Sequence, residues 1–313
     1  MEKLFPKLSK ATYNARVYYL GRLGVTDPKY YSTLKDIEST LRVINKGSVS
    51  TRKTSIMHVL SFLKAIGDDK LMNKYHSLVK EDIIKSAQDK EIDGVTNKSS
   101  TYKSLEDIQK ELLANKPKIL TLVKFNAYTN KVYYLNNLQD YILASIYILN
   151  PAIRNNYHDV KIINNLRQRD PNINQILINS KDVKFYLNKF KNVGSMGEQV
   201  IKYNNDTTKI IRSFYTLMKS QFTDMEYFIN SITRNGIKVL PDSALSARIK
   251  KINHHYFGED WSINDIRHIW ENAIQNDPNY MQHTISEREG MHRQLLHSAR
   301  QAMAYKTFDG KKI

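Results

Sequence analysis

Two stretches near the end of the chain decide its interpretation: SINDIRHIWENAIQN (residues 262–276) and REGMHRQLLHSARQAMAYKTF (residues 288–308). In the first, Ile263, Ile266 and Trp270 recur at the spacing of one helical face, which predicts an amphipathic helix. Arg267 and His268 lie within that helix. A guanidinium group can bind two oxygens of a phosphate at once, and an imidazole can hydrogen-bond the same phosphate.

The second stretch adds a histidine and a tyrosine. His297 precedes Tyr305 by eight residues. A phenol, with an ordinary pKa of about 10, can act as a nucleophile once deprotonated. Tyr280 is the other tyrosine after Arg267, but it lies in a turn containing Pro and Asn with no histidine motif before it. On the residues alone, a core histidine and a surface tyrosine are an alternative interpretation.

Three motifs resemble those of the tyrosine recombinases, the phage-integrase family. HSARQAMAY is similar to the family's histidine-to-tyrosine motif, and NDIRH is similar to its arginine–histidine motif. AIRNNYHDV, which places Arg154 just after a strongly apolar segment, resembles the first arginine motif as found in integrases of eukaryotic viruses and their parasites. Without the other motifs, Arg154 would be interpreted as an arginine that binds carbonyls at a helix end.

The resemblance covers about residues 104–308 and implies a catalytic lysine in a β-hairpin, for which Lys191 is the best match and Lys189 the second. The catalytic set that it implies is Arg154, Lys191, Arg267, His268, His297 and Tyr305. In this set the arginines neutralise the phosphate, the lysine protonates the leaving 5′-hydroxyl, and Tyr305 forms a 3′-phosphotyrosine. Neither metal nor ATP nor another cofactor is expected.

The chain departs from the common family pattern in several places, and the interval between His297 and Tyr305 is one residue shorter than the commoner one. Asn264 stands where most members have a histidine, and Asn donates a hydrogen bond but cannot accept the phenol's proton. The interval between Arg267 and His297 is longer than usual, and we expect the additional residues 277–289 to form a surface loop.

Composition points to a polyanionic partner. The net charge is +17, spread along the chain, and cysteine is absent. A folded surface with this charge attracts nucleic acid, although a lysine-rich proteome would give a similar composition. No apolar run predicts a membrane span or a signal peptide, so we expect an intracellular protein that binds double-stranded DNA with a strong salt dependence.

The first ninety residues predict four helices, ending near Gly24, Gly47, Gly67 and Lys90. Up to residue 80 this segment has 15 Lys and Arg against six Asp and Glu, whereas the next fifteen residues are acidic. We therefore predict a helical core-binding domain over residues 1–93, a polar linker at 94–103 and a catalytic domain over 104–313. The candidate contacts to the DNA backbone are Lys46, Arg52, Lys53, Lys64 and Lys70.

In the second domain, a capping box at Ser104 predicts a helix after it, and further helices are predicted at about 117–129, 134–149, 206–220 and 243–254. The helix at 134–149 is strongly apolar (LQDYILASIYIL), so we expect it to be buried. Short strands are predicted between Arg154 and Asn204. The expected fold is therefore mostly α with a small antiparallel sheet: a four-helix N-terminal bundle and a mixed α/β catalytic domain. His254 and His255 are adjacent, so a helix directs them differently, and we predict no metal site.

The function that the resemblance implies is site-specific DNA recombination, the integration or resolution of a viral or mobile-element genome. Members of the family self-associate on DNA, so a tetramer is expected during synapsis, and a host nucleus or viral factory would be the location. Two alternatives stay open: a DNA relaxase similar to type IB topoisomerases, and a DNA-binding protein of recombinase descent with a compromised site.

Overall fold

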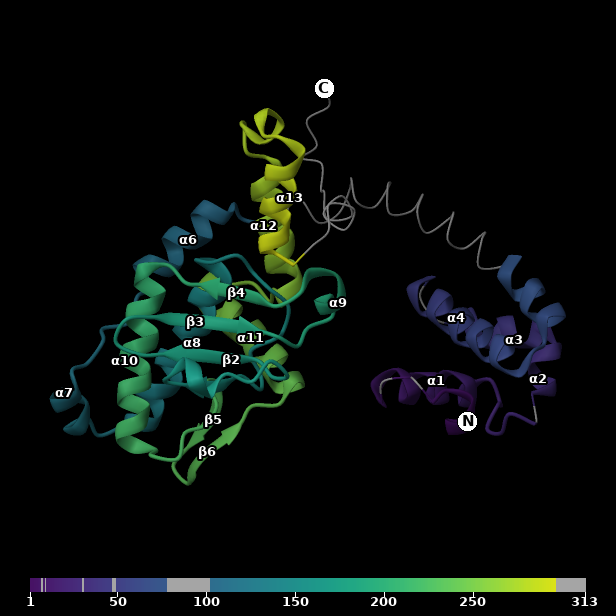
Figure 1. Cartoon of the computed structure of the whole chain (residues 1–313), viewed down its shortest axis with the longest axis horizontal. Coiled ribbons are helices and arrows are strands. Elements are labelled where there is room, and N and C mark those ends of the chain that lie inside the picture. The colour runs from purple at the N-terminus through teal and green to yellow at the C-terminus, as the bar shows by residue number, and fades with distance from the viewer. Residues whose placement is uncertain (7, 9, 30, 47–48, 78–101, 297–313) are drawn as a thin grey trace. The chain divides into compact units, whose positions relative to one another are not determined.

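The computed structural model describes the chain except for residues 7, 9, 30, 47–48, 78–101 and 297–313. The described residues form two compact units, one before and one after the gap at 78–101, and each has its own hydrophobic core. The chain is mostly helical with a small mixed sheet (Figure 1).

The N-terminal unit consists of η1 (Glu2–Leu4), α1 (Lys10–Arg22), α2 (Ser32–Lys35), α3 (Ile37–Ile44) and α4 (Val49–Ile66). A further helical segment begins at Asp69 and continues to the end of the described part at residue 77. Leu20 of α1 and Phe62 of α4 are fully buried, and the Tyr75 hydroxyl donates to the Leu34 carbonyl at 2.8 Å. Contacts between distant helices therefore hold this small unit together.

The predicted second helix is in fact two helices, α2 and α3, separated at Asp36. The Asp36 carboxylate accepts a hydrogen bond from the Ser39 amide at 3.0 Å and so caps α3. An N-cap residue has non-helical backbone angles, and Asp36 has φ −84° and ψ 88°. The prediction of one continuous helix was wrong because the apolar spacing continues across this capping residue.

The second unit is built on a buried central helix. Its helices are η3 (Leu166–Gln168), η4 (Tyr280–Gln282), α6 (Leu105–Ala114), α7 (Leu122–Asn126), α8 (Lys131–Ile148), α9 (Val193–Met196), α10 (Asn205–Gln221), α11 (Asp242–Phe257), α12 (Ile263–Gln275) and α13 (Ile285–Gln294). Residues on all sides of α8 are buried, and α6, α10, α11 and α12 contact it. A helix that is apolar all round belongs in a core, as the sequence predicted.

Two of the sequence predictions for helical segments in this unit need correction. The helix expected at 117–129 is only the short α7, which begins after Thr121, whose hydroxyl accepts from the Lys124 amide. Residues 277–289 are not a surface loop: they form η4 and the first half of α13. Thr284 and Glu287 make a reciprocal capping box that starts α13.

The larger sheet has the strand order β1-β2-β3-β4, with β1 (Lys161–Ile163), β2 (Gln175–Ile178), β3 (Val183–Leu187) and β4 (Gln199–Lys202). The pairs β2–β3 and β3–β4 are antiparallel, but β1 runs parallel to β2. The expected purely antiparallel sheet was therefore wrong, because residues 164–174, with η3, carry the chain back to the starting end of β1. In Figure 1, α8 lies behind this sheet.

A second, two-stranded sheet was not predicted. It consists of β5 (Asn230–Thr233) and β6 (Gly236–Val239), which pair antiparallel. Gly236 has φ +125°, a conformation open to glycine. The residues between the paired Thr233 and Gly236 are Arg234 and Asn235. An asparagine followed by a glycine between two apolar runs is a turn signal that was present in the sequence.

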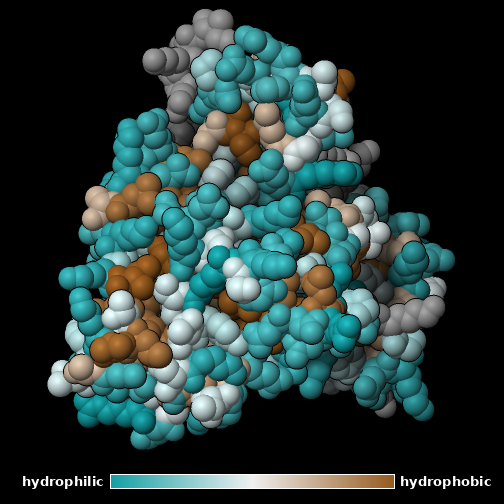
Figure 2. All heavy atoms as spheres, turned by 60° about the vertical axis from the view of Figure 1, so that its left-hand side comes forward, coloured by the Kyte–Doolittle hydropathy of each residue, from teal (hydrophilic) through white to brown (hydrophobic). Residues whose placement is uncertain are grey.

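The face shown in Figure 2 is largely hydrophilic, with separate hydrophobic patches. Among the exposed apolar side chains of the second unit are Leu122 and Val123 of α7, the latter 80% exposed. No helix in the described part of the chain is long and apolar enough to cross a membrane.

Candidate functional site

A buried aromatic cluster connects the elements that carry the predicted catalytic residues. Tyr147 of α8 packs edge-on against Tyr157, with ring centroids 5.6 Å apart, and Tyr157 lies 4.8 Å from Phe185 of β3. The Tyr203 hydroxyl donates to the Tyr157 oxygen at 3.2 Å. Burial raises the pKa of Tyr147 and Tyr157 well above the usual range, so these phenols stay protonated. Their role is to pack the neighbouring elements together.

The first arginine motif is fixed on this cluster by Tyr157, three residues after Arg154. On the other side, the Asn155 side-chain amide donates to Asp242 and Ser246 at the start of α11. Arg154 itself is half-buried, and its Nε is buried without a hydrogen-bond partner among the described residues. A rigid loop thus holds a guanidinium group that has hydrogen-bonding capacity left for an anion.

The second arginine motif lies on α12, which the Ser262–Asp265 capping box begins. The Trp270 Nε1 donates to the Tyr147 carbonyl at 2.8 Å, which joins α12 to the aromatic cluster. Arg267 is 1% exposed, and its Nη2 donates to the Leu295 carbonyl at 2.7 Å. The helix with the spacing that the sequence predicted therefore carries Arg267 into the interior.

The lysine motif lies in the connection between β3 and β4, which includes α9. The Asn174 side chain accepts from the backbone amides of Asn188 and Lys189 at 3.0 and 2.8 Å. The Asn192 side chain donates to the Leu296 carbonyl at 3.3 Å. Lys191 and Lys189 are both exposed. The backbone on both sides of Lys191 is thus fixed while its side chain faces solvent.

Three of the predicted motifs therefore converge. Arg267 and Asn192, the neighbour of Lys191, hold the consecutive carbonyls of Leu295 and Leu296, which directly precede His297. The Arg154 loop shares the aromatic cluster with α12 and β3. His297 and Tyr305 lie outside the described residues, so their predicted roles remain predictions.

The remaining predicted residues of the second unit lie on α12. His268 is half-buried next to Arg267, and Asn264 is exposed at the first turn of the helix. Nothing in their placement tests the roles that the resemblance implies for them.

The sequence did not predict a buried polar group between α12 and α13. Glu271 is 0% exposed and His292 is 3% exposed, and the carboxylate lies 2.6 Å from the imidazole Nδ1. The Tyr280 oxygen lies 2.8 Å from Nε2 of the same ring. The signal available in the sequence was Glu271, four residues after Arg267 and therefore on the same side of the helix.

The candidate DNA-backbone residues of the N-terminal unit lie at its surface. Lys46, Lys64 and Lys70 are exposed, whereas Lys53 and Arg52 are half-buried. The Arg52 guanidinium also donates to the Asn45 side chain at 3.4 Å. Contact with phosphate remains a prediction for all five.

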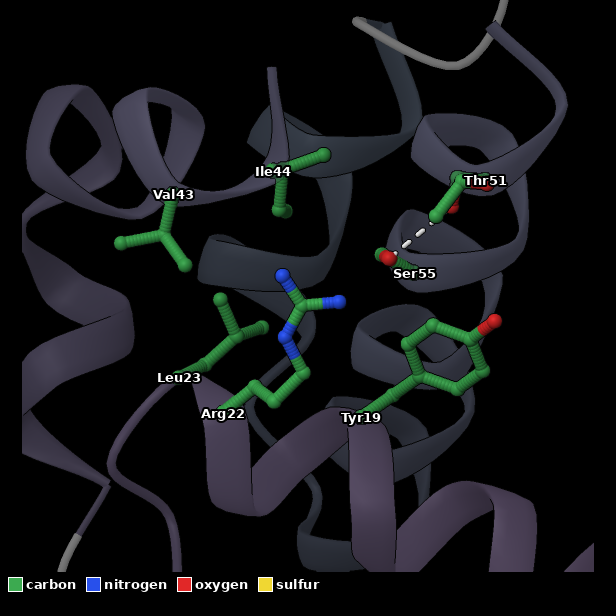
Figure 3. A pocket seen from close by; sticks show the side chains of 7 residues that line it. All are labelled: Tyr19, Arg22, Leu23, Val43, Ile44, Thr51 and Ser55. Carbon is green, nitrogen blue, oxygen red and sulfur yellow. Dashed lines mark hydrogen bonds between the residues drawn. The ribbon is translucent and has the colours of Figure 1, made fainter. Parts of the chain in front are cut away.

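A small pocket of this unit holds another cation, Arg22. Its guanidinium group extends from α1 toward Ile44, Thr51 and Ser55, as Figure 3 shows. The free volume is about 10 Å³, the lower limit for one water molecule. The pocket is therefore too small for an organic ligand.

A larger depression of about 470 Å³ lies between α8 and α11 and is lined by Tyr133, Asp140, Arg248, Lys251 and His255, among others. No group of three or more metal-binding side chains occurs in the part of the chain that the structure describes.

No family model matches the chain, and no curated protein matches it in sequence. Some solved structures are similar to the chain. Among them is the crystal structure of XerA recombinase, with 14% sequence identity and a TM-score of 0.41. The match covers 97% of this chain and 90% of that one. This similarity is weak.

Proposed function

We propose that this protein is a site-specific DNA recombinase that cuts and rejoins duplex DNA through a 3′-phosphotyrosine intermediate. The observation that carries the proposal is the convergence of the motifs: Arg267 and the loop of Lys191 hold adjacent carbonyls directly before His297. Motifs that form one catalytic site must lie close together in the fold, so this proximity supports the proposal more than the order of the motifs in the sequence does.

In the proposed reaction the Tyr305 oxygen attacks the phosphorus and forms a new O–P bond, while the bond from phosphorus to the 5′-oxygen breaks. Arg154 and His297 hold the non-bridging oxygens, and Lys191 gives a proton to the departing 5′-oxygen. The phenol's proton passes to water, since Asn264 cannot accept it. The energy of the cut bond is kept in the phosphotyrosine, so religation needs no ATP.

Arg267 is 1% exposed, and its Nη2 donates to the Leu295 carbonyl. In the proposed complex with DNA, this contact stays in place and orients the guanidinium group toward the phosphate. The biological setting in this proposal is the integration or resolution of a viral or mobile-element genome, by a tetramer assembled on DNA inside the cell.

The test is the trapping of a covalent adduct. The protein is incubated with a library of nicked duplexes with a randomised core, and an adduct that survives denaturation is expected. Tyr305→Phe should abolish the adduct with DNA affinity nearly unchanged. Arg154→Ala should slow adduct formation by about 10²–10³-fold, because one charge-stabilising donor is lost.

Tyr280→Phe removes the other tyrosine that follows Arg267, and it should still form the adduct, although more slowly, because its hydroxyl contacts His292. If the adduct forms on Tyr280 instead, the assignment of the nucleophile is wrong. If wild-type protein forms no adduct with any member of the library, the interpretation as a DNA-binding protein without strand transfer is favoured. Relaxation of a supercoiled plasmid without recombination would favour the relaxase alternative.

A further inference from the structure

His292 joins three elements of the second unit through one imidazole ring. Its Nδ1 lies 2.6 Å from the Glu271 carboxylate of α12, and its Nε2 lies 2.8 Å from the Tyr280 hydroxyl of η4. Glu271 and His292 are both almost fully buried. A carboxylate in such a place is costly unless polar groups surround it, and the Gln275 amide also donates to it, at 2.9 Å.

His292 lies close in sequence to the two carbonyls that bind Arg267 and Asn192. Leu295, whose carbonyl accepts from Arg267, follows His292 by three residues. Leu296, whose carbonyl accepts from Asn192, follows by four. A shift of His292 therefore displaces the two carbonyls on which the arginine and the lysine loop are aligned.

The backbone between these contacts is strained. Leu296 has φ +55°, in the left-handed region that residues with a side chain rarely adopt. Such a conformation persists when the contacts around it over-determine it. Here Glu271 and Tyr280 hold the chain before the turn, and Arg267 and Asn192 hold the turn itself.

We propose that His292 is a positioning residue: held by Glu271 and Tyr280, it keeps the strained turn at Leu296 in place, and this turn aligns Arg267 with the loop of Lys191. The expected effect of His292 on the cleavage rate rests on the proposed function. Its structural consequence, the hold on Arg267, can be measured without any reaction.

The first measurement is the exchange of the Arg267 guanidinium protons with solvent, followed by NMR. In His292→Gln, we expect these protons to exchange at least about tenfold faster, because the Leu295 carbonyl no longer stays in place. His283→Gln is the matched control: His283 follows η4 directly and lies 3.8 Å from Glu287. Unchanged Arg267 exchange in His292→Gln would overturn the proposal.

The second measurement separates chemistry from binding. Single-turnover cleavage of the nicked duplex should slow by up to about 100-fold in His292→Gln, because small misplacements of reacting groups cost this much. The DNA dissociation constant should stay within about threefold, since binding rests on phosphate contacts elsewhere. Tyr280→Phe removes one hydroxyl and should reduce the cleavage rate by a smaller factor, also with little change in DNA affinity. It replaces His292→Gln in this test if that variant does not fold.

The third measurement is a double-mutant cycle. Asn192→Ala removes the other hold on the turn, so its effect on the cleavage rate should not add to that of His292→Gln. Additive effects, or a rate loss that matches the loss of DNA affinity, would contradict the positioning role. If wild-type protein does not cleave but Arg267 exchange still responds to His292→Gln, the proposed function fails while the hold on Arg267 stands.

Discussion

Two arginines of the same predicted role lie in different environments. Arg154 is half-buried, whereas Arg267 is 1% exposed and donates to the Leu295 carbonyl. The contact of Arg267 joins α12 to the turn after α13. Loss of Arg267 should therefore affect both folding and chemistry, which makes Arg154 the cleaner probe of the site.

Lys191 can be tested as the general acid through the leaving group. If the 5′-bridging oxygen of the scissile phosphate is replaced by sulfur, the thiolate leaves without a proton, because a thiol has a pKa near ~8.5. We expect Lys191→Ala to slow cleavage of ordinary DNA by about 10²–10⁴-fold and to cleave the sulfur-containing duplex at nearly the wild-type rate.

The controls for this prediction are in the chain itself. Lys189→Ala should have little effect on either substrate, since Lys189 lies two residues before Lys191 and is the second match to the motif. Arg154→Ala should cleave both the ordinary and the sulfur-containing duplex slowly, because the lost guanidinium charge acts on the non-bridging oxygens and not on the leaving group. If the sulfur-containing duplex restores cleavage by Lys189→Ala but not by Lys191→Ala, Lys189 rather than Lys191 is the general acid.

At the level of elements, α11 is joined to α8 by one ion pair. The Arg248 Nε lies 2.5 Å from the Asp140 carboxylate, and its other nitrogens donate to the Asn230 and Asn136 carbonyls. Burial raises the pKa of Asp140 and outweighs the opposing effect of Arg248. The pair therefore matters chiefly because Arg248 also donates to two backbone carbonyls.

Arg248→Met should destabilise the protein by about 1–3 kcal/mol, since it leaves the half-buried Asp140 carboxylate without its ion-pair partner. Asp140→Asn, which keeps an acceptor and removes the charge, should cost far less. Lys251→Met, an exposed change on the same helix, is the control. Urea unfolding followed by circular dichroism measures all three.

The pH dependence of the Arg248→Met defect follows from the same pKa. A carboxyl whose folded-state pKa is raised destabilises the fold above that pKa, and the penalty disappears below its ordinary value near ~4. The difference in unfolding free energy between Arg248→Met and wild type should therefore shrink as the pH falls toward 4. A constant difference would contradict the assignment to Asp140.

At the level of the whole molecule, the predicted linker at 94–103 has an anchored end. The Tyr102 hydroxyl donates to Asp265 at 2.8 Å, and the Lys103 ammonium donates to Glu111 at 2.8 Å and to the Phe257 carbonyl at 3.1 Å. These two residues therefore belong structurally to the second unit. Tyr102 also connects the start of this unit to the capping residue of the Arg267 helix.

Limited digestion with trypsin tests this boundary. We expect the first cut after Lys98, within the polar stretch, and slower cutting after Lys103, whose side chain is bound. Mass spectrometry of the first fragments then finds a new N-terminus at Ser99. Lys98→Gln should delay the separation of the two units. A first cut between residues 105 and 296 would refute the two-domain prediction.

The sequence by itself determined the local structure of the site-bearing elements. The spacing of Ile263, Ile266 and Trp270 with the cap at Ser262 predicted α12, and the apolar run in LQDYILASIYIL predicted the buried α8. These signals lie within a few helical turns, where propensity, capping and side-chain periodicity act. The motif residues were identified at the same local level, through their resemblance to one family.

Only the tertiary structure decided how these elements meet. Arg267 binds a carbonyl 28 residues away and Asn192 one 104 residues away, while His292 meets Glu271 across two helices. The parallel pairing of β1 with β2 likewise depends on the path of the chain between them. Such contacts form when packing of the whole core repays the entropy of closing long loops, and no local pattern encodes that balance.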